Sequence, residues 1–100
     1  MKINFVRNTS IYESLRIDEK NIVEISKFIE AKGSSIVYDT GTKSGVISSP
    51  ISLEDGTSSF DDVNFKNGDY LLYSSCDNSF IVVNPNYYKD RFDILEEADV

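Results

Sequence analysis

Short turns separate most of the β-prone runs in this chain, and that spacing limits the folds it can adopt. In residues 67–83 the apolar runs YLLYS and SFIVV are joined by only four residues. Strands joined by so short a turn pair antiparallel, because parallel neighbours need a long crossover. Asn67 and Gly68 suit a turn before this hairpin, and Asp69 suits a hydrogen bond to the turn backbone. We expect the hairpin at the centre of an antiparallel sheet.

One segment, residues 19–32, has the periodicity of a long helix. Four apolar residues fall on one face of it: Ile22, Ile25, Phe28 and Ile29. Asp18 is a suitable N-cap, and Gly33 suits the end of the helix. A second, short helix is expected over residues 85–92, where proline is well tolerated at the first position.

The remaining β-prone runs complete the expected fold. We expect strands at residues 2–7, 11–17, 35–40, 45–49, 51–56 and 92–97. Pro50 predicts a break between two of these strands, and residues 58–69 are expected to form a polar loop whose apolar residues, Phe60, Val63 and Phe65, turn inward. The pattern predicts one α+β domain, residues 1–100, in which an antiparallel sheet carries one long helix and a short C-terminal helix.

The negative charge of the chain is concentrated in its second half. Residues 1–43 contain seven Lys/Arg and six Asp/Glu, whereas residues 44–100 contain three Lys/Arg and eleven Asp/Glu. Such a surface repels the phosphates of nucleic acid and favours basic protein surfaces. We therefore expect a protein partner with a basic surface and no direct binding of nucleic acid.

The residue types indicate a protein without catalysis, cofactor or metal. The chain has no histidine and one cysteine, Cys76, so neither a disulfide within the chain nor a histidine-based catalytic site can form. Glu13, between apolar neighbours, is the one candidate for a catalytic carboxyl group, and we expect it instead to lie at a strand edge or to accept a hydrogen bond from a neighbour. The acids near residues 61–69 lack the ligand spacing of an EF-hand. The chain is expected not to be an enzyme.

The expected location is the cytoplasm. No apolar run reaches the roughly 18 residues that a membrane-spanning helix needs. The first ten residues, MKINFVRNTS, lack the apolar core of a secretory signal. We therefore expect no contact with a membrane.

Three local motifs resemble those of a group of small proteins encoded by tailed phages and prophages. The segment Tyr12-Glu13-Ser14-Leu15 lies where that group has a V-E-A-I-like strand segment. The segment Gly68-Asp69-Tyr70-Leu71-Leu72 resembles a P-G-D-[YW]-[IL]-[IV] motif, although Asn67 replaces its proline. Pro85, Tyr88 and Phe92 keep the spacing of a closing P-x-x-F-x-x-x-[YF] motif. The resemblance implies a phage or prophage protein acting inside a bacterial host cell, and it supplies no catalytic residues.

These observations favour a protein that binds and inhibits a host defence protein, as anti-CRISPR proteins do, with carboxylates in place of the phosphates of DNA. The expected contact residues are Glu54, Asp55, Phe60, Asp61, Asp62, Asp69 and Tyr70. The alternative is a module that binds a small signalling ligand, in a basic pocket formed by Arg7, Arg16 and Lys43, or a structural module that pairs with copies of itself. The sequence leaves the oligomeric state open.

Overall fold

The computed structural model describes residues 2–8, 10–52 and 54–99. Within these residues the strands are β1 (Lys2–Arg7), β2 (Ile11–Arg16), β3 (Ser35–Asp39), β4 (Ser44–Ser52), β5 (Ser58–Lys66), β6 (Tyr70–Ser74), β7 (Ser79–Val83) and β8 (Asp93–Asp99). The helices are a 3₁₀ turn, η1 (Glu19–Asn21), followed directly by α1 (Ile22–Ala31), and the short α2 (Pro85–Arg91).

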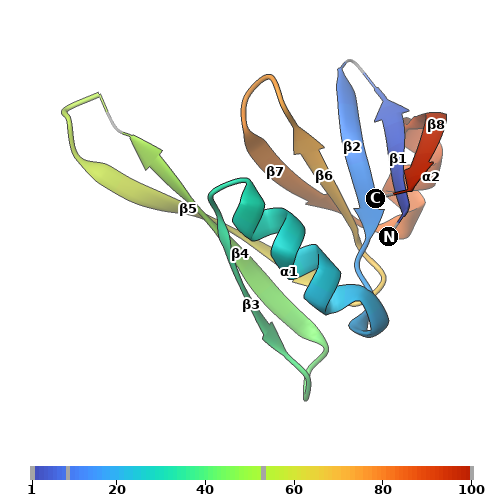
Figure 1. The fold of residues 1–100 in the computed structure, drawn as a ribbon, viewed down its shortest axis with the longest axis horizontal. Helices are drawn as coiled ribbons and strands as arrows, with labels where there is room; N and C mark the ends of the chain where they lie inside the picture. The colour runs from blue at the N-terminus through green and yellow to red at the C-terminus, as the bar shows by residue number, and fades with distance from the viewer. Residues whose placement is uncertain (1, 9, 53, 100) are drawn as a thin grey trace.

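The strands form two antiparallel sheets (Figure 1). The larger sheet has the order β7-β6-β2-β1-β8, and the smaller one has the order β3-β4-β5. The antiparallel α+β class is thus confirmed, but the expectation of a single sheet is wrong. The β6–β7 hairpin is also not central, because β7 lies at an edge of the larger sheet and β2 lies in the middle.

Local signals at both ends of the long helical segment behave as the sequence predicts. The Asp18 carboxylate accepts a hydrogen bond from the backbone N–H of Lys20 at 3.0 Å, and the Asn21 side chain accepts one from the N–H of Asp18 at 2.9 Å. Gly33 ends the segment with a φ of +89°, which favours glycine. The helix is shorter than expected because its first turn is 3₁₀. In the described residues, no helix has the length and apolarity needed to span a membrane.

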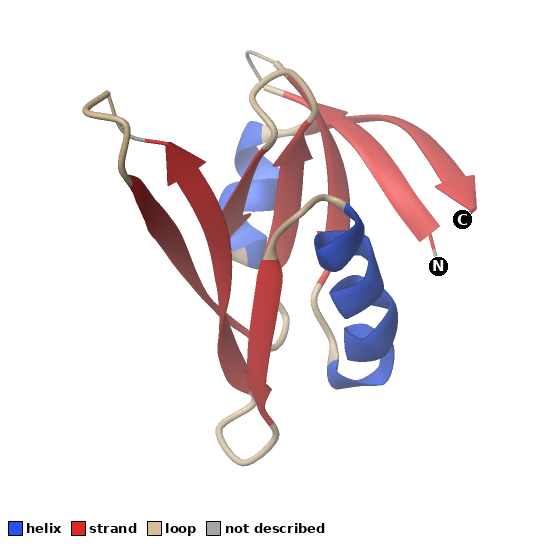
Figure 2. Ribbon diagram, turned by 60° about the vertical axis from the view of Figure 1, so that its left-hand side comes forward, coloured by secondary structure: helices blue, strands red, loops and turns tan. Residues whose placement is uncertain are grey.

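The main core lies where α1 meets both sheets. Ile25 and Ile29 of α1 are fully buried, and Ile22 and Phe28 pack beside them. They meet buried side chains from both sheets: Ile3, Leu15, Ile17, Ile47, Phe65, Leu71, Tyr73 and Phe80. Helix α1 also contacts β3 (Figure 2). The core residues of the smaller sheet come from its central strand and from β5.

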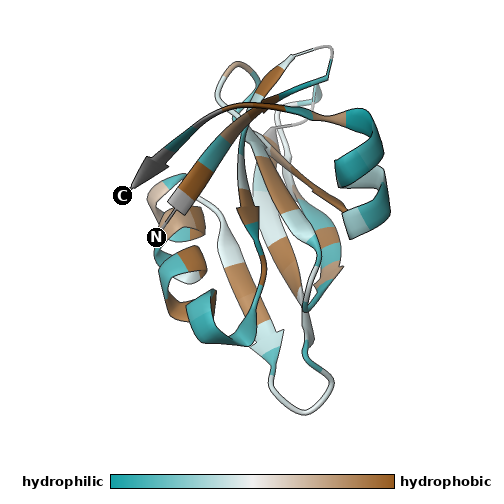
Figure 3. Cartoon of the chain, turned by 90° about the vertical axis from the view of Figure 1, so that its right-hand side faces the viewer, coloured by the Kyte–Doolittle hydropathy of each residue, from teal (hydrophilic) through white to brown (hydrophobic). Residues whose placement is uncertain are grey.

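A second core lies on the other face of the larger sheet. Helix α2 covers this face, on the side opposite α1 (Figure 3). Asn84 caps it by accepting a hydrogen bond from the N–H of Tyr87 at 2.8 Å. Tyr88 and Phe92 of the closing motif stack with ring centroids 5.9 Å apart and pack on the sheet with the buried residues Val6 and Leu72. The expected packing of Tyr88 and Phe92 is confirmed.

A hydrogen bond across this second core can be tested by mutation. The hydroxyl groups of Ser14, on β2, and Tyr88 lie 2.7 Å apart, and Ser14 is 1% exposed. Tyr88→Phe should lower the free energy of unfolding by about 1–3 kcal/mol, because it leaves the Ser14 hydroxyl buried without a partner. Tyr87→Phe, at a 42% exposed position one residue away, should change stability by less than about 0.5 kcal/mol in urea denaturation.

The double variant Ser14→Ala/Tyr88→Phe is the further control for this hydrogen bond. It removes both partners, so it should recover much of the stability that Tyr88→Phe loses. A double variant less stable than Tyr88→Phe alone would contradict the pairing.

Two predictions about the smaller sheet are wrong. Pro50 does not break the chain, since β4 continues through it, and most of the expected loop at residues 58–69 is strand β5. Pro50 is tolerated because β3 pairs with β4 only as far as Ser48, so β4 has one neighbouring strand at the proline. Phe65 turns inward as expected, but Phe60 is 67% exposed because it lies on the other face of β5.

Candidate functional site

The far end of the β4–β5 hairpin projects beyond α1 and beyond the rest of both sheets (Figure 1). Strand β3 stops pairing at Ser48, which lies opposite Asp62 on β5. From this pair outward, β4 and β5 pair only with each other. We call residues 48–62 the arm; the structure describes all of them except residue 53. Five of the seven predicted contact residues lie in it: Glu54, Asp55, Phe60, Asp61 and Asp62.

The arm has two faces, because successive strand residues point to opposite sides of a sheet. Phe60 lies opposite Pro50 and shares its face with Asp62, two residues further along β5. We call this the Phe60 face. Asp61 lies on the other face, opposite Ser49. The structure therefore separates the two neighbouring aspartates that the sequence groups together.

Exposed apolar side chains are unusually frequent on the arm. Phe60 is 67% exposed, Ile51 is 41% exposed, and Pro50 is exposed as well. The part of an aromatic side chain that remains in water contributes no hydrophobic free energy to folding. Exposed aromatic residues of this kind are typical anchors of protein interfaces. Sequence reasoning missed Pro50 and Ile51. The alternation of Val63 and Phe65 with polar neighbours in the paired segment was the available signal for a strand.

Two of the four carboxylates of the arm have local hydrogen bonds. Asp62 accepts a bond of 2.8 Å from the hydroxyl group of Ser48, across the strand pair. In the turn, Asp55 accepts bonds from the hydroxyl group of Thr57 at 2.6 Å and from its backbone N–H at 3.0 Å. These bonds, the hydroxyl bond first, lower the pKa of the Asp55 carboxyl below its ordinary value. The turn therefore keeps a negative charge at the tip of the arm.

The other two predicted contact residues, Asp69 and Tyr70, are not part of the arm. They follow the opposite end of β5, about six strand residues from Phe60, or roughly 20 Å away along the strand. Asp69 is 7% exposed and accepts a hydrogen bond from the N–H of Lys66 at 3.1 Å. Tyr70 stacks on Tyr88, with ring centroids 3.8 Å apart. Asp69 therefore supports the turn at Gly68, and Tyr70 packs against α2.

The acids of residues 61–69 do not form a shared cation site. Asp62 and Asn64 point to one face of β5, Asp61 points to the other, and Asp69 lies in the following turn. No group of three or more metal-binding acids, cysteines or histidines occurs among the residues that the structure describes.

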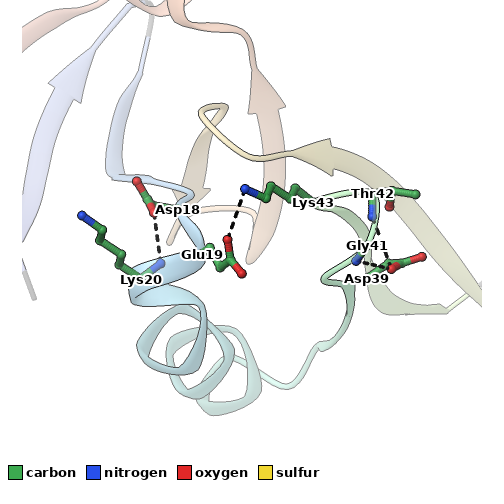
Figure 4. A network of polar contacts seen from close by, with 7 residues as sticks. All are labelled: Asp18, Glu19, Lys20, Asp39, Gly41, Thr42 and Lys43. Atoms are coloured by element: carbon green, nitrogen blue, oxygen red, sulfur yellow. Dashed lines mark hydrogen bonds and ion pairs between the residues drawn. The ribbon is translucent and has the colours of Figure 1, made fainter.

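The basic pocket considered for a small ligand does not assemble from its three residues. Arg7 pairs with Ile11 at one end of β2, whereas Arg16 lies at the other end, roughly 17 Å away along the strand. Lys43 lies in the β3–β4 turn and forms an ion pair with Glu19, with 3.6 Å between Nζ and Oε2 (Figure 4). Asp39 shapes the same turn by accepting hydrogen bonds from the N–H groups of Gly41 and Thr42.

No protein-family model, curated protein or solved structure matches the chain.

Proposed function

We propose that this protein is a non-enzymatic binding protein that contacts a basic surface of another protein through the Phe60 face of its arm. The observation that carries the proposal is the exposure of Phe60, 67%, beside the carboxylate of Asp62 on a projecting hairpin. An aromatic anchor next to a charge that favours one kind of partner is a common arrangement at protein interfaces.

The charge of the arm supports a basic partner. Residues 48–62 contain four Asp/Glu and no Lys/Arg, which is more than half of the net charge of −7 of the whole chain. Because the arm projects from the molecule, these charges act on an approaching partner with little compensation from neighbouring cations. They favour a basic surface and oppose the phosphates of nucleic acid.

The β4 edge of the arm disfavours the addition of a partner strand. A partner strand needs a continuous row of free backbone N–H and C=O groups. Pro50 lies on β4 beyond the end of β3 and has no N–H to offer there. The proposed contact therefore uses side chains such as Phe60 and Asp62 and not the backbone of the β4 edge.

The resemblance to phage proteins supports a host defence nuclease as the partner class. In this proposal the arm enters the basic nucleic-acid channel of such an enzyme, where its carboxylates take the place of phosphates and inhibit it, as in anti-CRISPR proteins that mimic DNA.

The test compares two charge reversals on a partner isolated from a bacterial lysate with the unaltered protein as bait. Asp62→Lys and Asp61→Lys change the net charge equally, but only Asp62 lies on the Phe60 face. In surface kinetics we expect Asp62→Lys to weaken binding at least about tenfold and Asp61→Lys to weaken it less. Association should also slow as the salt concentration rises.

Two outcomes would contradict the proposal. Equal and small effects of the two reversals would show that the Phe60 face is not the contact, and salt-independent association would remove the electrostatic argument. Phe60→Ala is a second test of the contact face, because it should weaken binding without changing the net charge.

The alternative of self-association is tested without any partner. If sedimentation shows a dimer that Phe60→Ala abolishes, the same face joins two copies of the chain. A monomer at all concentrations supports a different protein as the partner.

A further inference from the structure

A groove of about 460 Å³ lies between α1 and the first two strands, well away from the arm in the sequence. Its walls come from β1, β2 and α1: Ile3, Glu13, Glu24, Lys27, Phe28, Ala31 and Lys32. The volume is in the range of sites for small molecules. Three of the lining residues are apolar and four are charged, so the groove combines a hydrophobic surface with groups that can orient a ligand.

Glu13 is an unusual residue for the centre of a sheet, and the expectation of a strand edge or a hydrogen-bonded position is wrong. It lies on the central strand β2, paired with Phe5 on one side and Tyr73 on the other, and it is only partly exposed. Within the described residues, its carboxylate has neither a hydrogen bond nor an ion pair. A partly buried carboxylate among aromatic neighbours is costly unless a cation or donor joins it. Glu13 is therefore available to a positively charged group that enters the groove.

The helix side of the groove supplies the opposite charge. Lys27 is exposed on α1, and Lys32 follows the end of the helix. The Lys32 ammonium group lies 4.7 Å from the ring centroid of Tyr73 and 5.2 Å from that of Phe28. These contacts hold one ammonium group near the apolar part of the groove. Among the described residues, Lys27 makes no such contact to an aromatic ring.

From this juxtaposition we propose that the groove binds a small zwitterion of amino-acid size. Its ammonium group pairs with Glu13 and its carboxylate pairs with Lys27, while an aliphatic segment covers Phe28. The groove is lined by two carboxylates and two ammonium groups, so their formal charges sum to zero. A ligand that carries only one charge would be repelled by the two side chains of the same sign. A zwitterion can pair each of its two charges with a side chain of opposite charge.

The proposal is tested with three probes of equal chain length. ε-Aminocaproate carries both charges, caproate carries only the carboxylate, and hexylamine carries only the ammonium group. In titrations followed by amide NMR, ε-aminocaproate should give saturable shifts at the residues that line the groove. The other two probes should bind at least about tenfold more weakly, because each lacks one charged contact. Equal binding of all three, or no saturation across the millimolar range, would overturn the proposal.

Matched variants assign the contacts. Glu13→Gln should weaken binding of ε-aminocaproate at least about tenfold and leave the weak binding of caproate unchanged. Lys27→Gln, at an exposed helix position, should weaken both of these probes and leave hexylamine unchanged. Glu30→Gln is the control, because Glu30 is exposed on the same helix and does not line the groove. An effect of Glu30→Gln equal to that of Glu13→Gln would show a general charge effect and overturn the assignment.

This inference is independent of the proposed function of the arm. Asp62→Lys should leave ε-aminocaproate binding unchanged, and Glu13→Gln should leave partner binding unchanged. The failure of one proposal is therefore distinguishable from the failure of the other.

Discussion

Replacing Phe65 by alanine is expected to lower the free energy of unfolding by about 3–5 kcal/mol. Phe65 is 4% exposed and belongs to the core that joins both sheets to α1. Its ring is parallel to that of Tyr38, with 6.2 Å between centroids. The change removes buried apolar surface and leaves a cavity in a core that cannot collapse fully around it. Chemical denaturation measures the loss.

Phe60→Ala is the matched control for this prediction. It makes the same chemical change on the same strand, but Phe60 lies on the opposite face and is 67% exposed. We expect it to change stability by less than about 0.5 kcal/mol. Losses of similar size in the two variants would mean that the faces of β5 are assigned wrongly, and would also remove the basis for the proposed contact face.

Strand β5 shows why part of the fold was missed from the sequence. Asp61, Asp62 and Asn64 suggest a polar loop, since all three are common in turns. Because one face of this strand meets water and its outer half has no core beneath it, Phe65 is the one buried residue of β5. A strand with so little buried surface gives a weak alternating pattern.

The division into two sheets also could not be predicted. The sequence predicts a polar loop before the turn at Asn67 and Gly68, yet this segment is β5, which lies in a different sheet from β6. Backbone hydrogen bonds explain the arrangement: the N–H of Gly68 donates to Ile17 at 2.7 Å, and the N–H of Ile17 donates to Asp69 at 2.8 Å. The turn is thereby held at the end of β2, which pairs with β6. These partners lie about fifty residues apart, so local patterns do not identify them.

Signals that depend on neighbouring residues were predictable. The cap at Asp18, the stop at Gly33 and the Asn84-Pro85 start of α2 all involve contacts within one helical turn. The candidate site was predictable only in part. Its acids were visible as a charged stretch, but the strand that assigns Asp61 and Asp62 to different faces was not.

Gly45→Ala is expected to destabilise the smaller sheet by about 1–3 kcal/mol or more, because the strands leave no room for a side chain at this position. A Cβ atom on Gly45 would lie 2.1 Å from the carbonyl oxygen of Val37 and 2.6 Å from the Phe65 ring. The Val37 oxygen belongs to the backbone of β3, so relief requires that strand to move away from β4. Gly41→Ala, in the adjoining turn, is the matched control.

At Gly41 the nearest atom to an added Cβ is the end of the Asp39 side chain, at 3.1 Å, which can move aside. Its loss in chemical denaturation should therefore be clearly smaller than that of Gly45→Ala. The Gly45→Ala/Phe65→Ala double variant separates the effects of the two close contacts. Removing the Phe65 ring relieves only the second contact, so the double variant should remain less stable than Phe65→Ala alone. Stability equal to that of Phe65→Ala would show that the ring, and not the close approach of β3, excludes a side chain at residue 45.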